Sequence, residues 1–160
     1  MNSKNKGNSF ERKMANTLSK KFEPVYNKTQ AFRRNPDSGS FFGGLNETRV
    51  ATHHEASAHF GDIIVPPDFK FCIECKHYKD PPLLAAFLTQ SISQWDKWIE
   101  QATADARKAN KDFLLIIKYN RVPEIVITEN NLYNGLPYKE YWVSQLTTVL
   151  SKPNSDFIES

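Results

Sequence analysis

Hydrophobic residues recur at helical spacing in three parts of the chain. Between Ser9 and Phe22 an apolar residue stands at every fourth position, which predicts a helix with one apolar face. A second helix is predicted to begin at the Pro81-Pro82 pair, where proline suits the first turn. Its apolar residues follow in steps of three and four to about Asn110. A third helix is expected from about Tyr138 to Leu150.

The segment FGDIIVPPDFKFCIECKHYK, residues 60–79, predicts a β-hairpin with its turn at Pro66, Pro67 and Asp68. Side chains alternate between the two faces of a strand. One face would carry Lys70, Cys72, Glu74 and Lys76, and the other Phe69, Phe71, Ile73 and Cys75. The turn would place Asp62 opposite Ile73 or Glu74, so that two carboxylates and an ammonium group meet at one end of the hairpin.

Three further strands are expected: a short one from Asn27 to Phe32, a central one at residues 113–119, and one at residues 123–128. The order of elements predicts a single α/β domain over residues 1–150, with a mixed central β-sheet flanked by helices. Residues 35–59 are interpreted as a long loop, which is typical of functional or mobile segments. Residues 151–160 are interpreted as a polar tail.

The charge of the chain is unevenly distributed. The net charge of the 160 residues is only +3, but the first 34 residues carry nine lysines and arginines against Glu11 and Glu23. Such a segment suits a phosphate backbone, although a solvated helix surface explains it equally well. The only cysteines, Cys72 and Cys75, would lie on opposite strand faces, which predicts reduced thiols, with Cys75 in the core, and no zinc site. Without a signal peptide or a long apolar run, an intracellular protein is expected.

The carboxylates of Asp62 and Glu74 are the chemically informative residues of the predicted hairpin. Carboxylate oxygens suit Mg²⁺ or Mn²⁺, and Lys76 beside them could orient a water that attacks a phosphodiester. The alternative is a solvated surface salt bridge that contributes little. Glu11 also has two interpretations, since it stands three residues after Asn8 and could close a capping box at the helix start.

Several motifs occur together in one order: KGNSFERKMANTL, FRRNPDSGS, GDIIV and CIECK, then a helix and an apolar strand. Over about residues 6–128 this order resembles the archaeal-type Holliday junction resolvases and related PD-(D/E)xK endonucleases, some of them phage-encoded. The resemblance implies a restriction-endonuclease-like fold and Mg²⁺- or Mn²⁺-dependent DNA cleavage. The implied catalytic residues are Glu11, Asp62, Glu74, Lys76 and a loop serine, Ser38 or Ser40. The implied metal ligands are Asp62, Glu74, the Cys75 carbonyl and Glu11. The residues expected to contact DNA are Lys6, Arg12, Arg33 and Arg34.

A junction resolvase makes two symmetric cuts, so the resemblance also implies a homodimer on four-way DNA junctions. Trp98 and Trp142 could lie in the interface between subunits, with core packing as the default. Three other functions stay open: a restriction-type, flap or replication-associated nuclease, a non-catalytic nucleic-acid-binding module, and a protein-interaction domain. The segment from Ser40 to Gly61 is longer than is usual in the family. Its residues His53, His54, Glu55 and His59 are either solvated or serve as metal ligands, phosphate contacts or an acid–base group.

Overall fold

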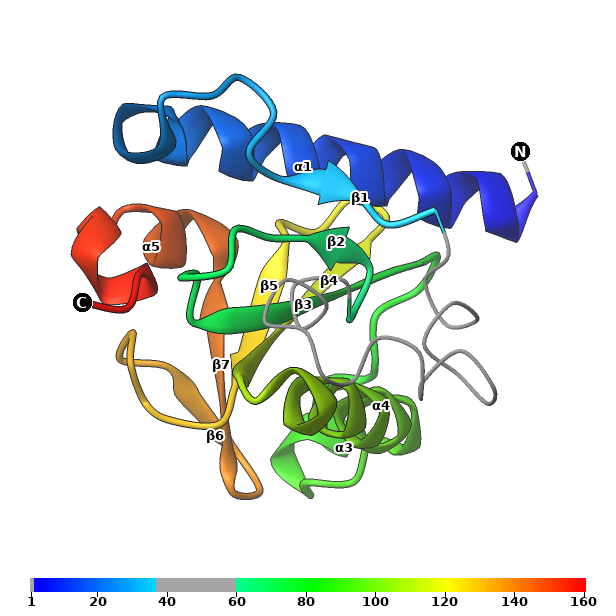
Figure 1. Cartoon of the computed structure of the whole chain (residues 1–160). Helices are drawn as coiled ribbons and strands as arrows, with labels where there is room; N and C mark the ends of the chain where they lie inside the picture. Colours follow the sequence, from blue (N-terminus) through cyan, green and yellow to red (C-terminus); the bar gives the residue numbers. More distant parts are fainter. Residues whose placement is uncertain (1, 37–59) are drawn as a thin grey trace.

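Five strands form the central sheet, in the order β3-β4-β5-β7-β6 (Figure 1). The strands are β3 (Phe71–Tyr78), β4 (Asp112–Tyr119), β5 (Ile125–Thr128), β7 (Tyr141–Gln145) and β6 (Leu136–Tyr138). β3 and β4 run parallel, and the other neighbouring pairs run antiparallel. The computed structural model describes residues 2–36 and 60–160. Its mixed sheet packed against helices confirms the predicted restriction-endonuclease-like α/β class.

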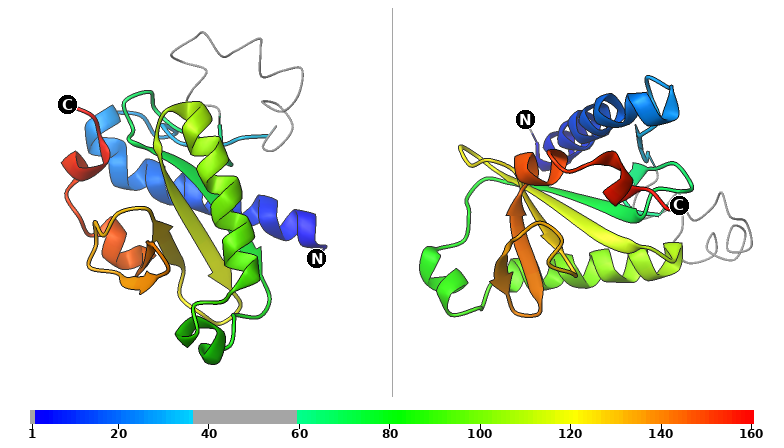
Figure 2. Two further views of the ribbon diagram at one scale, coloured as in Figure 1. Left: turned by 90° about the horizontal axis from the view of Figure 1, so that it is seen from below. Right: turned by 90° about the vertical axis from the view of Figure 1, so that its left-hand side faces the viewer.

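Helices cover both faces of this sheet and create two separate cores (Figure 2). On one face lie α1 (Ser3–Tyr26) and α5 (Leu146–Leu150), and on the other lie α3 (Leu84–Leu88) and α4 (Ser93–Ala109). The first core joins α1, the odd-numbered residues of β3 and the C-terminal residues. The second joins α4 to the opposite face of β3, β4 and β5. The continuous apolar run of β4 is therefore buried on both faces, as predicted for a central strand.

Helix α1 is longer than the apolar spacing predicts. It begins at Ser3, because the Asn2 side chain caps it by accepting a hydrogen bond from the Asn5 N–H at 2.8 Å. It ends at Tyr26, and the left-handed backbone of the next residue, Asn27, closes the last turn. The capping-box interpretation of Glu11 is wrong, because Glu11 lies in the interior of the helix and is buried.

The predicted strand at residues 27–32 is also wrong. The backbone N–H and C=O of Phe32 both bond to the Ser19 hydroxyl, each at 2.9 Å, instead of to a neighbouring strand. The strand that forms is β1 (Arg33–Arg34), which pairs antiparallel with β2 (Ile63–Ile64). It lies against α1, next to the central sheet (Figure 1).

The hairpin prediction over residues 60–79 holds only in part. The turn is present, with the Phe69 N–H bonded to the Pro66 carbonyl at 3.0 Å. However, β2 pairs with β1, and the Asp62 N–H bonds to the Ile73 carbonyl of β3. The C-terminal segment takes the place that a full hairpin would need, because Phe69 bridges to Ile158.

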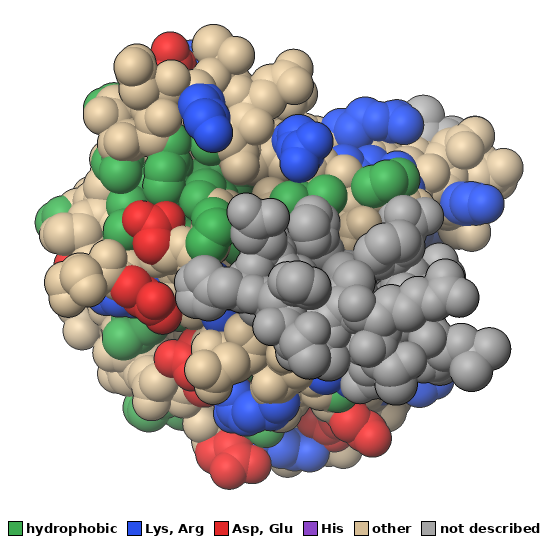
Figure 3. Space-filling model, in the orientation of Figure 1, with side chains coloured by type: hydrophobic (Ala, Val, Ile, Leu, Met, Phe, Trp, Pro, Cys, Tyr) green, Lys and Arg blue, Asp and Glu red, His purple; other side chains and the backbone are tan. Residues whose placement is uncertain are grey.

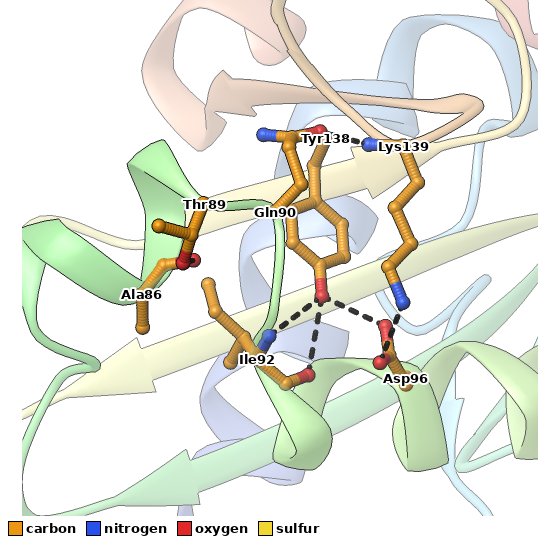
Figure 4. Close-up of polar contacts among 7 residues, drawn as sticks. All are labelled: Ala86, Thr89, Gln90, Ile92, Asp96, Tyr138 and Lys139. Atoms are coloured by element: carbon orange, nitrogen blue, oxygen red, sulfur yellow. Dashed lines mark hydrogen bonds and ion pairs between the residues drawn. The ribbon is translucent and has the colours of Figure 1, made fainter.

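The second predicted helix is broken into α3 and α4, although its end at Asn110 is confirmed. Between the two helices Gln90 has a φ of 57°. The hydroxyl of Tyr138 fixes the restart of the helix, accepting from the Ile92 N–H at 3.0 Å and lying 2.7 Å from an Asp96 carboxylate oxygen (Figure 4). A long-range contact with β6 therefore divides what looks like one continuous helix in the sequence.

The last predicted helix is mostly wrong. Residues 138–145 contribute to β6, a tight turn at Lys139 and β7, and only Leu146–Leu150 is helical. The aromatic and β-branched residues of this segment pair with β5, which favours a strand over a helix. Residues 151–160 include a 3-10 helix, η3 (Asn154–Phe157), and Phe157 is 1% exposed in the first core.

Candidate functional site

The candidate site lies along β3, the strand at one edge of the central sheet. The predicted alternation is confirmed: Ile73 and Cys75 enter the core beneath α1, while Cys72 enters the core beneath α4. Both cysteines are free and Cys75 is buried, as predicted, and Cys72 is buried as well. Glu74 and Lys76 continue the series begun by Cys72 and therefore face the α4 side of the sheet.

Asp62 is held against the edge of β3 by its backbone and by its side chain. Its N–H bonds to the Ile73 carbonyl at 2.8 Å, and one of its carboxylate oxygens accepts from the Cys75 N–H at 2.8 Å. Gly61 allows this close approach, since its φ is +83° and a Cβ there would lie 2.6 Å from the Ile73 carbonyl oxygen. The structure therefore places Asp62 beside β3, across from Ile73, which is one of the two positions that the sequence predicts.

Glu74 is the most deeply buried carboxylate of the site, with 1% of its surface exposed. Within the described residues, its Oε2 atom has no hydrogen-bond partner. Burial raises the pKa of Glu74 well above its ordinary value, and the charge of Asp62 raises it further. Asp105 raises it as well, through a hydrogen bond between the two carboxyl groups and through its charge. The charge of Lys76 acts in the opposite direction, so Glu74 lies between two acidic neighbours and one basic one.

Glu11 reaches the same region from α1, on the other side of the sheet. Its Oε2 atom accepts a hydrogen bond from the Arg34 Nε at 2.7 Å, and Arg34 also donates to the Asn8 side chain at 2.7 Å. Burial and the charge of Asp62 raise the pKa of Glu11 to about 7, while Arg34 lowers it. Asp62 is therefore the common acidic neighbour of Glu11 and Glu74.

The oxygen atoms along β3 are of the kind that binds a divalent cation. Glu74 offers a buried oxygen that has no partner in the part of the chain that the structure describes, and Asp62 lies next to it with carboxylate oxygen of its own. The N–H and C=O of one strand residue point the same way, so the Cys75 carbonyl faces the side from which Asp62 accepts the Cys75 N–H. Among residues 2–36 and 60–160, no three His, Cys, Asp or Glu side chains are grouped to hold a metal ion. The fitting donors are therefore two carboxylates and a backbone carbonyl.

Two residues of α4 belong to this region and were missed by sequence reasoning. The ammonium group of Lys76 donates to Oε1 of Gln101 at 2.8 Å, and Asp105 lies one helical turn further along, close enough to raise the pKa of Glu74. The signal that could have found them is helical phase, because Gln101 and Asp105 each precede a buried alanine by one position, Ala102 and Ala106.

The residues expected to contact DNA lie in different surroundings. Arg12 and Arg33 are exposed, Lys6 is half-buried, and Arg34 is held by Glu11 and Asn8. Lys and Arg side chains gather over α1 on the face drawn in Figure 3. The two adjacent arginines of β1 therefore differ: Arg33 is open to solvent, whereas Arg34 already has an acidic partner.

Some predicted site residues lie outside the described residues: Ser38, Ser40, His53, His54, Glu55 and His59. Trp98 is 5% exposed and packs against Tyr78 and Tyr119, so the core-packing interpretation holds for it. Trp142 is half-buried in β7.

Residues 2–157 match the protein family described as "Phage putative PDDEXK endonuclease". This chain belongs to that family. The match covers nearly the whole chain, and it implies a phosphodiester hydrolase that acts on DNA. PDDEXK nucleases generally use a divalent metal. None of the curated proteins and none of the solved structures matches the chain. Among the described residues, no helix has both the length and the apolar character that crossing a membrane requires.

Proposed function

We propose that this PDDEXK family member is a Mg²⁺- or Mn²⁺-dependent, structure-selective DNA endonuclease whose reactive centre is the Asp62–Glu74 edge of β3. The single observation that carries the proposal is the Glu74 Oε2 atom, which is buried and has no hydrogen-bond partner among the described residues. An ionised carboxylate in that position is costly unless something pairs with it. A divalent cation would supply the missing partner, since its charge favours the ionised form of neighbouring carboxylates.

Three donors would hold the cation: the carboxylates of Asp62 and Glu74 and the carbonyl of Cys75. Glu11 would join them once Arg34 has released its carboxylate. When bound, a divalent cation polarises the scissile phosphate and stabilises the departing oxygen. Lys76, on the same strand face as Glu74, would donate a hydrogen bond that orients the attacking water. The two-residue repeat of β3 would thus place one acidic ligand, Glu74, and the basic residue, Lys76, on the same face.

Phosphate groups on either side of the cut would be bound by Arg12, Arg33 and Lys6. Arginine suits this role because its planar group can make two parallel hydrogen bonds to phosphate oxygens. Such contacts position DNA without reading its sequence. They suit an enzyme that selects DNA by its branched shape.

The preferred substrate within this proposal is the four-way DNA junction, because the order of motifs resembles the junction resolvases. Resolution needs two cuts in opposed strands, and therefore two copies of the chain related by two-fold symmetry. Ser38 or Ser40 would assist the reaction from the segment between Arg34 and Asp62. Each of these points is tested by the choice of DNA and by the position of the cuts.

The test is a cleavage panel with labelled four-way junction, flap, linear duplex and single strand, each with Mg²⁺ and with EDTA. Three proteins are compared: wild type, Glu74→Gln, and Glu100→Gln as a matched control. Glu74→Gln keeps the size of the side chain but removes a metal ligand of the proposed site. We expect the cleavage rate to fall about 10³-fold, which corresponds to an increase of several kcal/mol in the activation free energy. Glu100 is exposed on α4, and its variant should cleave like wild type.

Paired symmetric nicks in the junction, abolished by EDTA and by Glu74→Gln, would support the whole proposal. Cleavage of another DNA alone would keep the nuclease site and reject the junction as its substrate. Full activity of Glu74→Gln would remove Glu74 from the reactive centre.

A further inference from the structure

Within residues 2–36 and 60–160, the ammonium group of Lys76 has one hydrogen-bond partner, and that partner lies on helix α4. Its Nζ atom lies 2.8 Å from Oε1 of Gln101. An ammonium group can only donate, so the Gln101 atom that faces it must be the amide oxygen. The contact therefore has one chemically consistent arrangement of the amide.

A lysine side chain that has to orient a water needs such a contact. Its four-carbon stem is flexible, and holding it in one conformation costs conformational entropy. Neither Asp62 nor Glu74 forms an ion pair with Lys76 among the described residues, although the Lys76 charge acts on the pKa of Glu74. The direct restraint on the ammonium group comes from Gln101.

The side chain of Gln101 is exposed, but the helix that carries it has a fixed position. The helix is anchored on β3 and β4 by buried residues on both sides of Gln101, among them Trp98, Ala102 and Ala106. Its N-terminal turn is fixed by the Tyr138 hydroxyl (Figure 4).

From this geometry we infer that Gln101 is a positioning residue of the cleavage reaction, which holds the Lys76 ammonium group where it meets the attacking water. The inference rests on the proposed function of Lys76 and extends it to a residue of α4. Gln101 acts through Lys76. Its removal should slow the chemical step and leave DNA affinity unchanged.

The test compares Gln101→Met, Gln101→Glu and Gln94→Met with wild type. Methionine matches the length of glutamine without its acceptor, and glutamate restores an acceptor oxygen at the same reach. Gln94 is the matched control: it lies on the same helix about 10 Å away, and its Oε1 accepts from the Tyr119 hydroxyl instead. The measurements are the single-turnover cleavage rate at saturating enzyme and Mg²⁺, DNA affinity by fluorescence anisotropy with Ca²⁺, and the urea unfolding midpoint.

For Gln101→Met we expect a rate about tenfold below wild type, with DNA affinity and unfolding midpoint unchanged, since a displaced reacting group costs rate and not binding. Gln101→Glu should recover most of that loss, and Gln94→Met should cleave like wild type. The inference is overturned if Gln101→Met cleaves at the wild-type rate, if its loss appears in DNA affinity, or if Gln101→Glu is as slow as Gln101→Met. Absence of cleavage by folded wild-type protein on every DNA would instead reject the proposed function itself.

Discussion

The two faces of strand β3 differ in their chemistry. Toward α1 the strand presents Phe71, Ile73 and Cys75, which all enter an apolar core. Toward α4 it presents Cys72, Glu74 and Lys76. Ile73 is fully buried and Glu74 is 1% exposed, so adjacent residues lose nearly all their contact with water.

Burial has opposite energetic consequences on these two faces. Removing an isoleucine side chain from water contributes roughly 1.5–3 kcal/mol to stability. Burying the Glu74 carboxylate, one of whose oxygens has no partner among the described residues, costs free energy instead. The α1 face therefore stabilises the strand, whereas the α4 face holds a carboxylate in an unfavourable environment. Three predictions test this difference.

The largest effect on stability should come from the apolar face. Ile73→Ala creates a cavity in the core and should lower the free energy of unfolding by about 2–5 kcal/mol. Glu74→Gln removes the charge from the opposite face and should leave the free energy of unfolding unchanged or raise it. Urea unfolding of both variants in EDTA measures the difference. An equal loss in the two variants would mean that Glu74 stabilises the fold, and the contrast between the faces would fail.

The pH dependence of stability should come from the acidic groups around Asp62. The pKa of Glu11 is raised to about 7, so the folded state retains a proton that the unfolded state has lost. The stabilising contribution is complete below the ordinary pKa of about 4.5 and is lost as the pH rises through 7. The raised pKa of Glu74 acts in the same direction.

In EDTA, the free energy of unfolding should therefore fall between about pH 5 and about pH 8, by on the order of 1 kcal/mol for Glu11 after allowance for screening by solvent. Glu11→Gln should flatten this fall, while the control Glu100→Gln should not. Added Mg²⁺ should oppose it, because a cation binds the ionised carboxylates. Stability that increases over this pH range in EDTA would contradict the raised pKa values.

The smallest effect is expected for cation binding and depends on the ion pair between Glu11 and Arg34. Glu11 differs in this respect from Glu74, one of whose oxygens has no partner among the described residues. In the proposed site, Arg34 would compete with a cation for the Glu11 carboxylate, and a DNA phosphate is a suitable alternative partner for Arg34. DNA should therefore strengthen cation binding, by about fivefold or more, the usual lower range of coupling between two sites. Arg34→Gln should reduce this coupling.

Calorimetric titration with Mn²⁺, with and without a DNA made uncleavable at the cut, measures this coupling. Arg121→Gln, an exposed arginine in the turn between β4 and β5, is the control and should keep the wild-type coupling. Equal coupling in Arg34→Gln and wild type would show that the ion pair does not link the two ligands.

Much of this architecture could be predicted from local pattern. The apolar face of α1, the central strand at residues 113–119 and the alternation along β3 follow from the spacing of hydrophobic residues, which depends on helix and strand geometry alone. The errors fall where a distant residue overrides that pattern. Ser19 satisfies the backbone of Phe32, Tyr138 interrupts the helix before α4, and pairing with β5 turns residues 141–145 into a strand.

The sequence by itself determined the fold class, the relationship to PDDEXK endonucleases and the order of acidic and basic residues along the chain. It could do so because strand alternation and motif order are one-dimensional properties. Only the tertiary structure decided which groups are already paired: Arg34 holds Glu11, Gln101 holds Lys76, and one Glu74 oxygen has no partner among the described residues. The physical reason is that burial and hydrogen bonding depend on groups brought together from α1, β1, β3 and α4. No spacing along the chain encodes which of these contacts forms.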